Sequence, residues 1–398
     1  MDLRDLIDAI VASPDDDAPR RVYADALLEA GEPQGELIHI QCDLARGGYT
    51  RDEGVARRRR ERELLQAHGA RWTAGLRGLA TFPVFRRGFV DEVVADPERW
   101  PENGENIFAA APALRGVMLD GLTGKDERES EDEASARIMG HWQRAIACPA
   151  SRRVRGLGYC GLGFECRVFG EVTPGWESLG DQALVALMAT DTSRLDSLDI
   201  RDSDYRGHEA LFISEQMKKL ARLAILLHGI NDTQDLFRAL TGSRIRSLAL
   251  LGNYLGVLDH PVLATLTELR IDSYNLDLAF PTDTLERFAL SAETITADLV
   301  DRMISSVRGV RELNLDGDTV PGYRHLERAD LLHLRELRVY GSDVGYAEAE
   351  AILKMPCAAQ LEVLQLKSID DEGRAALEQR FGVVVDVHDR SRRCVYWR

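Results

Sequence analysis

One short pattern of apolar and polar positions recurs along the second half of the chain. Each copy reads apolar, two further residues, apolar, one further residue, apolar. From Leu195 onward eight copies follow one another: LDSLDI, LARLAI, IRSLAL, LTELRI, LERFAL, VRELNL, LRELRV and LEVLQL. The last three positions of each copy alternate in polarity, which is typical of a short strand with one buried face.

The spacing of these copies predicts a fold class. Their middle apolar residues are Leu198, Leu223, Leu248, Leu269, Phe288, Leu313, Leu337 and Leu364, so successive copies lie 25, 25, 21, 19, 25, 24 and 27 residues apart. Leucine-rich repeats have periods of about 20 to 29 residues. Between the strands, residues 296–307 and 346–355 carry apolar residues at intervals of three and four, which predicts amphipathic helices. Since such units bury a core only when they stack, we predict an α/β leucine-rich-repeat solenoid over residues 191–382.

Two weaker copies precede this region. LRGVML and VRGLGY have the middle residues Val117 and Leu157, and the steps of 40 and 41 residues around Leu157 indicate insertions within residues 120–175. We therefore assign residues 81–190 to a first strand and irregular leading repeats. Phe85, Phe89, Val90 and Val93 supply that first strand, and residues 383–398 are expected to form a final strand and cap.

The first 80 residues predict a small all-α module. Apolar residues recur on one side of residues 2–12, 18–30 and a segment that begins near Gln34, and a fourth, charged segment leads to Trp72. Asp17 is placed to cap the second helix, and Gly31 and Pro33 end it.

A motif within this module resembles a known family. The segment DDDAPRRVYADALLEAGEPQGELIHIQ is similar to the bacterial repeat-companion domain, a helical module that precedes repeats. The matching residues are Asp16, Pro19, Arg20, Tyr23, Ala24, Asp25, Leu27, Gly31, Glu32, Pro33, Gly35, Glu36, Ile38 and Gln41. Ala26 stands where family members often have tryptophan. The resemblance implies a bacterial, cytoplasmic, repeat-associated protein and assigns no enzymatic activity.

The charge balance bears on the partner class. The net charge is -16, which disfavours nucleic acid and anionic membranes, because phosphate groups are bound by clustered Lys and Arg. The basic run Arg57–Arg60 with Arg62 is interleaved with Glu61 and Glu63, which favours a solvated helix face with charge pairs over a nucleic-acid site. No run of apolar residues is long enough to span a membrane, and the acidic N-terminus lacks the basic start of a secretory signal. We expect a cytoplasmic protein.

Candidate catalytic and metal sites are weak. The six cysteines contain no CxxC pair, and His141, Cys148, Cys160 and Cys166 are spaced more widely than zinc ligands usually are. Asp15, Asp16, Asp17 and Asp25 lack the spacing of a calcium loop and are better explained by helix capping and pairing with Arg20 or Arg21. Tyr23, Asp25, Glu36 and Gln41 are expected to form one polar cluster between the second and third helices. We predict no catalytic residues, no metal and no cofactor.

Polar residues between and after the buried strand positions are the candidate binding site. On a solenoid they line the concave face: Asp199, Arg201, Arg270, Asp272, Tyr274, Asn314, Asp316, Arg338, Tyr340, Gln365 and Lys367. Ala224, Leu226, Ala249 and Leu251 occupy equivalent positions in earlier copies and predict an adjoining apolar patch. Mixed charges with tyrosines predict a non-catalytic protein or peptide site. The alternative is an accessory or catalytic subunit of a peptide-modifying system, with a metal or cysteine site near Cys160 and Cys166.

Overall fold

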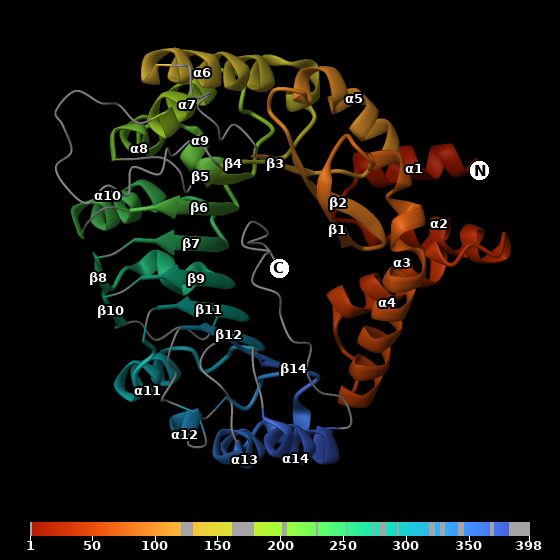
Figure 1. Ribbon diagram of the computed structural model, residues 1–398, viewed down its shortest axis with the longest axis vertical. Helices are drawn as coiled ribbons and strands as arrows, with labels where there is room; N and C mark the ends of the chain where they lie inside the picture. Colours follow the sequence, from red (N-terminus) through yellow and green to blue (C-terminus); the bar gives the residue numbers. More distant parts are fainter. Residues whose placement is uncertain are drawn as a thin grey trace. The chain divides into compact units, whose positions relative to one another are not determined.

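The computed structural model describes residues 2–120, 130–160, 179–200, 205–227, 230–252, 254–273, 275–278, 284–292, 294–317, 323–326, 331–340, 346–366 and 370–381 (Figure 1). The chain divides into two compact units, Met1–Ala210 and Leu211–Arg398. Among the helices of the described ranges, none has the length and apolarity to cross a membrane.

Four helices open the first unit. They are α1 (Leu3–Ala12), α2 (Asp17–Glu29), α3 (Gln34–Arg46) and α4 (Arg51–Trp72). Local chemistry sets their starts, because the Asp2 and Thr50 side chains each cap a helix in a reciprocal capping box. The cap of α2 is Asp16, whose side chain accepts from the Ala18 amide, and not Asp17 as predicted.

The strands of the first unit begin with a hairpin. Strands β1 (Thr81–Arg86) and β2 (Phe89–Ala95) are antiparallel. Strands β3 (Gly116–Asp120), β4 (Gly156–Cys160) and β5 (Ser197–Ile200) follow in parallel. Their connections contain α5 (Trp100–Ala110), α6 (Glu131–Ala147), η2 (Pro149–Arg152) and α7 (Leu179–Met188). The short helix η1 (Ala74–Leu76) precedes β1, and α8 (Tyr205–Phe212) follows β5.

Parallel strands also organise the second unit. The main strands are β6 (Arg222–Leu226), β7 (Ser247–Leu251), β9 (Glu268–Asp272), β11 (Arg287–Ser291), β12 (Glu312–Asp316), β13 (Glu336–Tyr340) and β14 (Val363–Leu366). They pair in this order, and the middle residues Leu223, Leu248, Leu269, Phe288, Leu313, Leu337 and Leu364 share one register row. Six of these seven side chains are at most 2% exposed, and Leu364 is 8% exposed, so one sheet face forms the core.

The other elements of the second unit vary from one connection to the next. They are α9 (Gln216–Lys219), α10 (Ile230–Leu240), β8 (Tyr254–Leu258), η3 (Pro261–Thr265), β10 (Asn275–Leu278), α11 (Ala297–Ser306), α12 (Tyr323–Leu326), α13 (Tyr346–Lys354), η4 (Ala358–Gln360) and α14 (Asp371–Phe381). Strands β8 and β10 form a separate parallel pair, with α10 against β8 and α11 against β10. Where the connections are short, a strand thus takes the place of a helix in the second layer.

The fold-class prediction is wrong. The strands form an open, mostly parallel twelve-stranded sheet in the order β1-β2-β3-β4-β5-β6-β7-β9-β11-β12-β13-β14, and a leucine-rich-repeat solenoid is not shown. The spacing of the strands predicts a repeated unit. The connections between the strands differ, because they include helices, 3-10 turns and the strands β8 and β10, so no uniform unit recurs. The all-α N-terminal module is also only partly seen. Helices α1–α4 share their unit with β1–β5, and Phe89 of β2 belongs to the same core as Ile10 and Ile38.

Candidate functional site

The sheet of Leu211–Arg398 has a polar face opposite its core. Alternate strand positions point to opposite faces, and parallel pairing aligns them between strands. Three rows of side chains therefore cross the strands on this side. We call them the first, middle and last rows of the polar face, in the order in which each strand passes through them along the chain. The burial pattern alternates clearly in β9, β11 and β12, where side chains in these rows are exposed or half-buried between buried apolar neighbours.

The middle row contains four of the eleven predicted binding residues. Pairing places Arg270, Ala289, Asn314, Arg338 and Gln365 side by side on β9, β11, β12, β13 and β14. All five side chains are half-buried. The row continues into Ala249 and Ala224, which are 6% and 1% exposed, so the predicted apolar patch is largely covered at these two positions.

The last row is acidic. Asp272, Ser291, Asp316 and Tyr340 align across β9, β11, β12 and β13. The Tyr340 hydroxyl donates to Oε1 of Gln365 at 3.0 Å, which joins the last row to the middle row. Asp316 is exposed, and Asp272 is half-buried. Arginines in one row and aspartates in the next give the polar face two neighbouring stripes of opposite charge.

The first row holds charge pairs that the sequence analysis did not select. Arg287 lies 3.5 Å from Glu268, and Ser247 donates to Glu268 at 2.9 Å. Arg338 of the middle row forms an ion pair with Glu336 of the first row at 2.5 Å and lies 3.9 Å from Glu312. Glu336 is only 2% exposed, so Arg338 compensates a buried carboxylate. The sequence contains a signal that could have found these pairs. The residue just before the middle apolar residue is Glu or Arg in four successive strands of the sheet, β9, β11, β12 and β13.

The remaining predicted residues do not join this surface. Asp199 lies in the first unit, on β5, and is 3% exposed. Arg201, Tyr274 and Lys367 lie outside the residues that the structure describes. The described part of the candidate site is therefore carried by β9 and β11–β14 alone.

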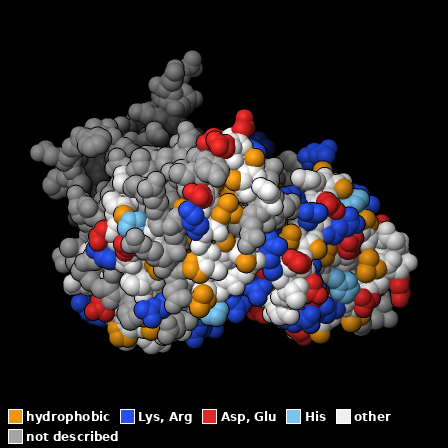
Figure 2. Space-filling model, turned by 90° about the horizontal axis from the view of Figure 1, so that it is seen from below, with side chains coloured by type: hydrophobic (Ala, Val, Ile, Leu, Met, Phe, Trp, Pro, Cys, Tyr) orange, Lys and Arg blue, Asp and Glu red, His pale blue; other side chains and the backbone are white. Residues whose placement is uncertain are grey.

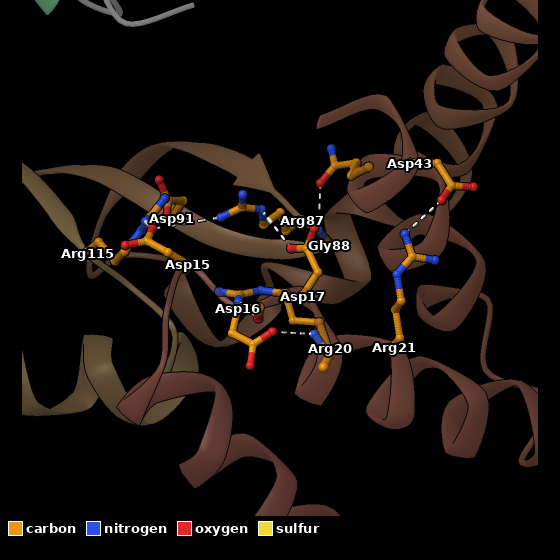
Figure 3. Close-up of polar contacts among 12 residues, drawn as sticks. Asp15, Asp16, Asp17, Arg20, Arg21, Asp43, Arg87, Gly88, Asp91 and Arg115 are labelled. Carbon is orange, nitrogen blue, oxygen red and sulfur yellow. Dashed lines mark hydrogen bonds and ion pairs between the residues drawn. The ribbon is translucent and has the colours of Figure 1, made fainter. Parts of the chain in front are cut away.

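A second polar cluster lies at the start of the first unit (Figure 3). Asp15 lies 3.0 Å from Arg115 and 3.9 Å from both Arg87 and Arg155. Each arginine has a further partner: Arg87 pairs with Asp17 at 2.9 Å, Arg115 with Asp91 at 2.5 Å and Arg155 with Asp196 at 2.5 Å. We call these seven residues the arginine–aspartate network. It connects the α1–α2 turn with the hairpin and with the residues at the starts of β3, β4 and β5.

The network corrects the predicted partners of the aspartates. Arg20 is 3% exposed and donates only to the backbone carbonyl of Asp16, at 2.9 Å, and its Nε has no hydrogen-bond partner. Burial lowers the pKa of Arg20, and the charges of Arg87 and Arg115 lower it further. Arg21 pairs with Asp43 at 2.8 Å. One aspartate of the group, Asp16, does cap a helix, but the pairing partners of the others come from far along the chain.

The polar cluster predicted between α2 and α3 does not form as one group. Asp25 pairs with His39 at 2.8 Å, and Glu36 pairs with Arg60 at 2.7 Å. Tyr23 packs its ring against Phe89, with 5.6 Å between ring centroids. These residues therefore contact separate partners and do not form the single cluster that was predicted.

Gln41, the last residue of the motif, holds the hairpin turn. Its Oε1 accepts from the Gly88 amide at 2.6 Å, and its Nε2 donates to Glu61 at 2.6 Å. Gln34 donates to the Gly88 carbonyl at 3.0 Å. Gly88 has a φ of +83°, and a Cβ there would lie 2.7 Å from Cα of Ile38. Two glutamines at the two ends of this part of α3 thus bind the backbone N–H and C=O of one glycine in the β1–β2 turn.

Two arginines of the basic run on α4, Arg57 and Arg60, form charge pairs of the kind predicted. Arg60 contacts Glu36 and Glu63, and Arg57 lies within 4 Å of Asp43 and Glu53 and over the ring of Tyr49. Figure 2 shows basic, acidic and apolar side chains interspersed over the described part of the face it draws. These pairs reduce the positive charge that phosphate binding requires.

Among the described residues, no group of three or more His, Cys, Asp and Glu side chains is arranged to hold a metal ion. Cys148 is buried with Sγ 3.6 Å from the Ser151 hydroxyl, and Nδ1 of His141 accepts from Arg144 at 2.8 Å. The side chain of Cys160 and the whole of Cys166 lie outside the described residues, so the alternative site near them has no geometry to support it.

Buried thiols give a direct chemical prediction. Burial raises the pKa of Cys42 and of Cys357 to about 11, against an ordinary value near 9. Because only the thiolate is reactive, both thiols should resist a disulfide reagent at pH 8 in the folded protein and react after denaturation. Peptide mass spectrometry after labelling measures this at each position. Since the folded-state pKa is raised, the stabilisation is present below pH 9 and is lost between about pH 9 and 11. Labelling of both cysteines at equal rates in the folded and denatured chain would contradict it.

No model of a protein family matches this chain, and no curated protein matches it at a significant level of sequence similarity.

Proposed function

We propose that this protein binds an extended polypeptide segment on the polar face of β9 and β11–β14, without catalysing a reaction on it. The observation that supports the proposal is the register of the rows, which sets arginines and aspartates in adjacent lines on hydrogen-bonded strands. Side chains mounted on a sheet hold their spacing, so they suit a ligand with matching charges. We propose the cytoplasm as the location, since buried free thiols are typical of reducing compartments.

The spacing within the middle row defines the partner's chemistry. Arg270 and Arg338 are separated by three strand-to-strand steps, which is about 14 Å at about 4.8 Å per step. In an extended segment, residues four positions apart are also separated by about 14 Å and face the same side. We therefore propose a segment with two acidic side chains four residues apart, and one basic side chain midway between them on the same side, near Asp316 of the last row.

Ala289 allows a test that leaves the charge pairs intact. It lies in the middle row between Arg270 and Asn314, is half-buried and has no polar group to lose. An indole at this position covers the neighbouring row positions. We expect Ala289→Trp to weaken binding of a selected peptide at least tenfold in fluorescence polarisation. Ser305→Trp on α11 is the matched control, because Ser305 is exposed and lies off the sheet.

Peptides for this measurement come from selection on the full chain, with counter-selection against Ala289→Trp. We expect enrichment of acidic pairs four residues apart, and a synthetic peptide with the same residues two apart should bind more weakly. Selection without enrichment, or equal affinity for the wild type and Ala289→Trp, contradicts the proposal. Charge reversal at Arg338 is a poor probe of peptide binding. It would place a third carboxylate beside Glu336 and Glu312 and so would also affect the stability of the sheet.

A further inference from the structure

A cavity of 380 Å³ lies within Met1–Ala210, apart from the polar face. It opens to the surface and is lined by the end of α6, η2, the start of β4, the end of α7 and the segment that leads into β5. Its volume falls in the range of small-molecule sites, which is about 300 to 1,000 Å³. The sequence analysis selected none of the residues that line it as candidates for a binding site.

The inside of the cavity is apolar. Val154, Leu157, Leu187 and Leu195 line it and are 1%, 4%, 3% and 5% exposed. They come from three stretches of the chain: the start of β4, the end of α7 and the segment before β5. Branched side chains of this kind favour an aliphatic or aromatic body over water.

The residues at its mouth include two cations. Arg152 and Arg194 both line the cavity and are exposed, and Arg194 donates to the Arg152 carbonyl at 3.3 Å. Neither guanidinium has a carboxylate within 4 Å among the ion pairs of the described residues. Asp191, also at the mouth, accepts from the Ser193 amide at 3.0 Å. The hydrogen bonds from Ser193 are the main cause that lowers the pKa of Asp191, and the charges of Arg152 and Arg194 lower it less. On a chain with a net charge of -16, a cationic mouth on an apolar cavity is a distinct local feature.

We propose that this cavity binds a small amphiphilic carboxylate, with the apolar body among the four buried side chains and the carboxylate between Arg152 and Arg194. Guanidinium groups bind carboxylates through paired N–H donors, so two of them at one mouth fix the ligand's polar end. At about 30 Å³ for each water-sized group, the cavity holds roughly a dozen non-hydrogen atoms. A straight-chain acid of ten carbons has that size.

This site is independent of the proposed peptide binding. None of its lining residues belongs to the polar face, and the two lie in different units of the chain. Loss of one activity therefore leaves the other intact, and each can be measured alone on the same preparation.

Titration calorimetry of the full chain with decanoate, below its micelle concentration, tests the proposal. We expect one site, with decanol binding at least tenfold more weakly. Arg152→Gln with Arg194→Gln should weaken decanoate binding at least tenfold and leave decanol unchanged. Ala147→Trp should abolish binding of both ligands, since Ala147 lines the cavity and is exposed, so the indole enters the space without replacing a core residue.

Arg144→Gln is the matched control, because Arg144 is an exposed arginine of α6 that does not line the cavity. It should bind decanoate as the wild type does. Absence of decanoate binding to the wild type overturns the proposal. Equal affinity of decanoate for the wild type and the double arginine variant overturns it as well.

Discussion

Gly88→Ala is expected to destabilise the first unit by about 3 kcal/mol or more. Two costs add at this position. A side chain at a φ of +83° costs about 1–2 kcal/mol, and the added methyl group would overlap Ile38, including its backbone Cα at 2.7 Å. Ile38 lies on α3 and is fully buried, so it has little room to move. Urea denaturation and hydrogen exchange of the α3 and β2 amides measure the loss.

Gly140→Ala is the matched control for this substitution. Gly140 lies inside α6 and has no atom within 4 Å of the Cβ position. Alanine has the higher helix propensity, so this variant should be more stable by about 0.5–1 kcal/mol. If Gly88→Ala unfolds at the wild-type urea concentration, the close packing between α3 and the hairpin turn is wrong.

Arg115→Met is expected to cost about 3–5 kcal/mol. Arg115 is the closest partner of Asp91, which is 4% exposed and whose remaining arginine, Arg86, lies at 3.4 Å. Burial alone would lower the pKa of Arg115, but the hydrogen bond and charge of Asp91 raise it above its ordinary value. Methionine keeps much of the side-chain volume and removes the charge, which leaves a buried carboxylate undercompensated. The shift of the urea midpoint measures the effect.

Asp15→Asn tests the exposed side of the same network. The Asp15 side chain is 73% exposed, although it lies near three arginines. Exposed ion pairs contribute about 0–1 kcal/mol, so this variant should unfold close to the wild type. A loss as large as that of Arg115→Met would show that burial does not decide the energetics here. If Arg115→Met loses much more stability than Asp15→Asn, as we expect, the Asp91–Arg115 pair carries most of the network's contribution to stability.

Local sequence signals predicted the elements well. The apolar stripes of residues 2–12 and 18–30 correspond to α1 and α2, and the segment from Gln34 corresponds to α3. The middle apolar residues lie on strands, and in Leu211–Arg398 they share one register row. These predictions succeeded because helix and strand periodicities, capping side chains and turn glycines act over a few residues.

Other features depended on contacts that sequence spacing does not encode. The role of Gln41 follows from a contact with Gly88, 47 positions later, and the partner of Asp15 is 100 positions away. Half of the residues that line the cavity come after the insertion that precedes α7, and the pattern of apolar positions does not predict where they lie. The resemblance to the repeat-companion domain remains a prediction, and the contacts of Gln41 give one residue of its motif a structural role.

The sequence by itself determined where helices and strands occur and which strand positions are buried, because burial of apolar residues at a fixed period is a local property. Only the tertiary structure decided how those elements combine. The connecting segments differ in length and apolar content, so they form helices in some places and β8 and β10 in others. That difference replaced the predicted solenoid with an open twelve-stranded sheet. It also set the charged rows, since the neighbours of a side chain across strands depend on register and not on position along the chain.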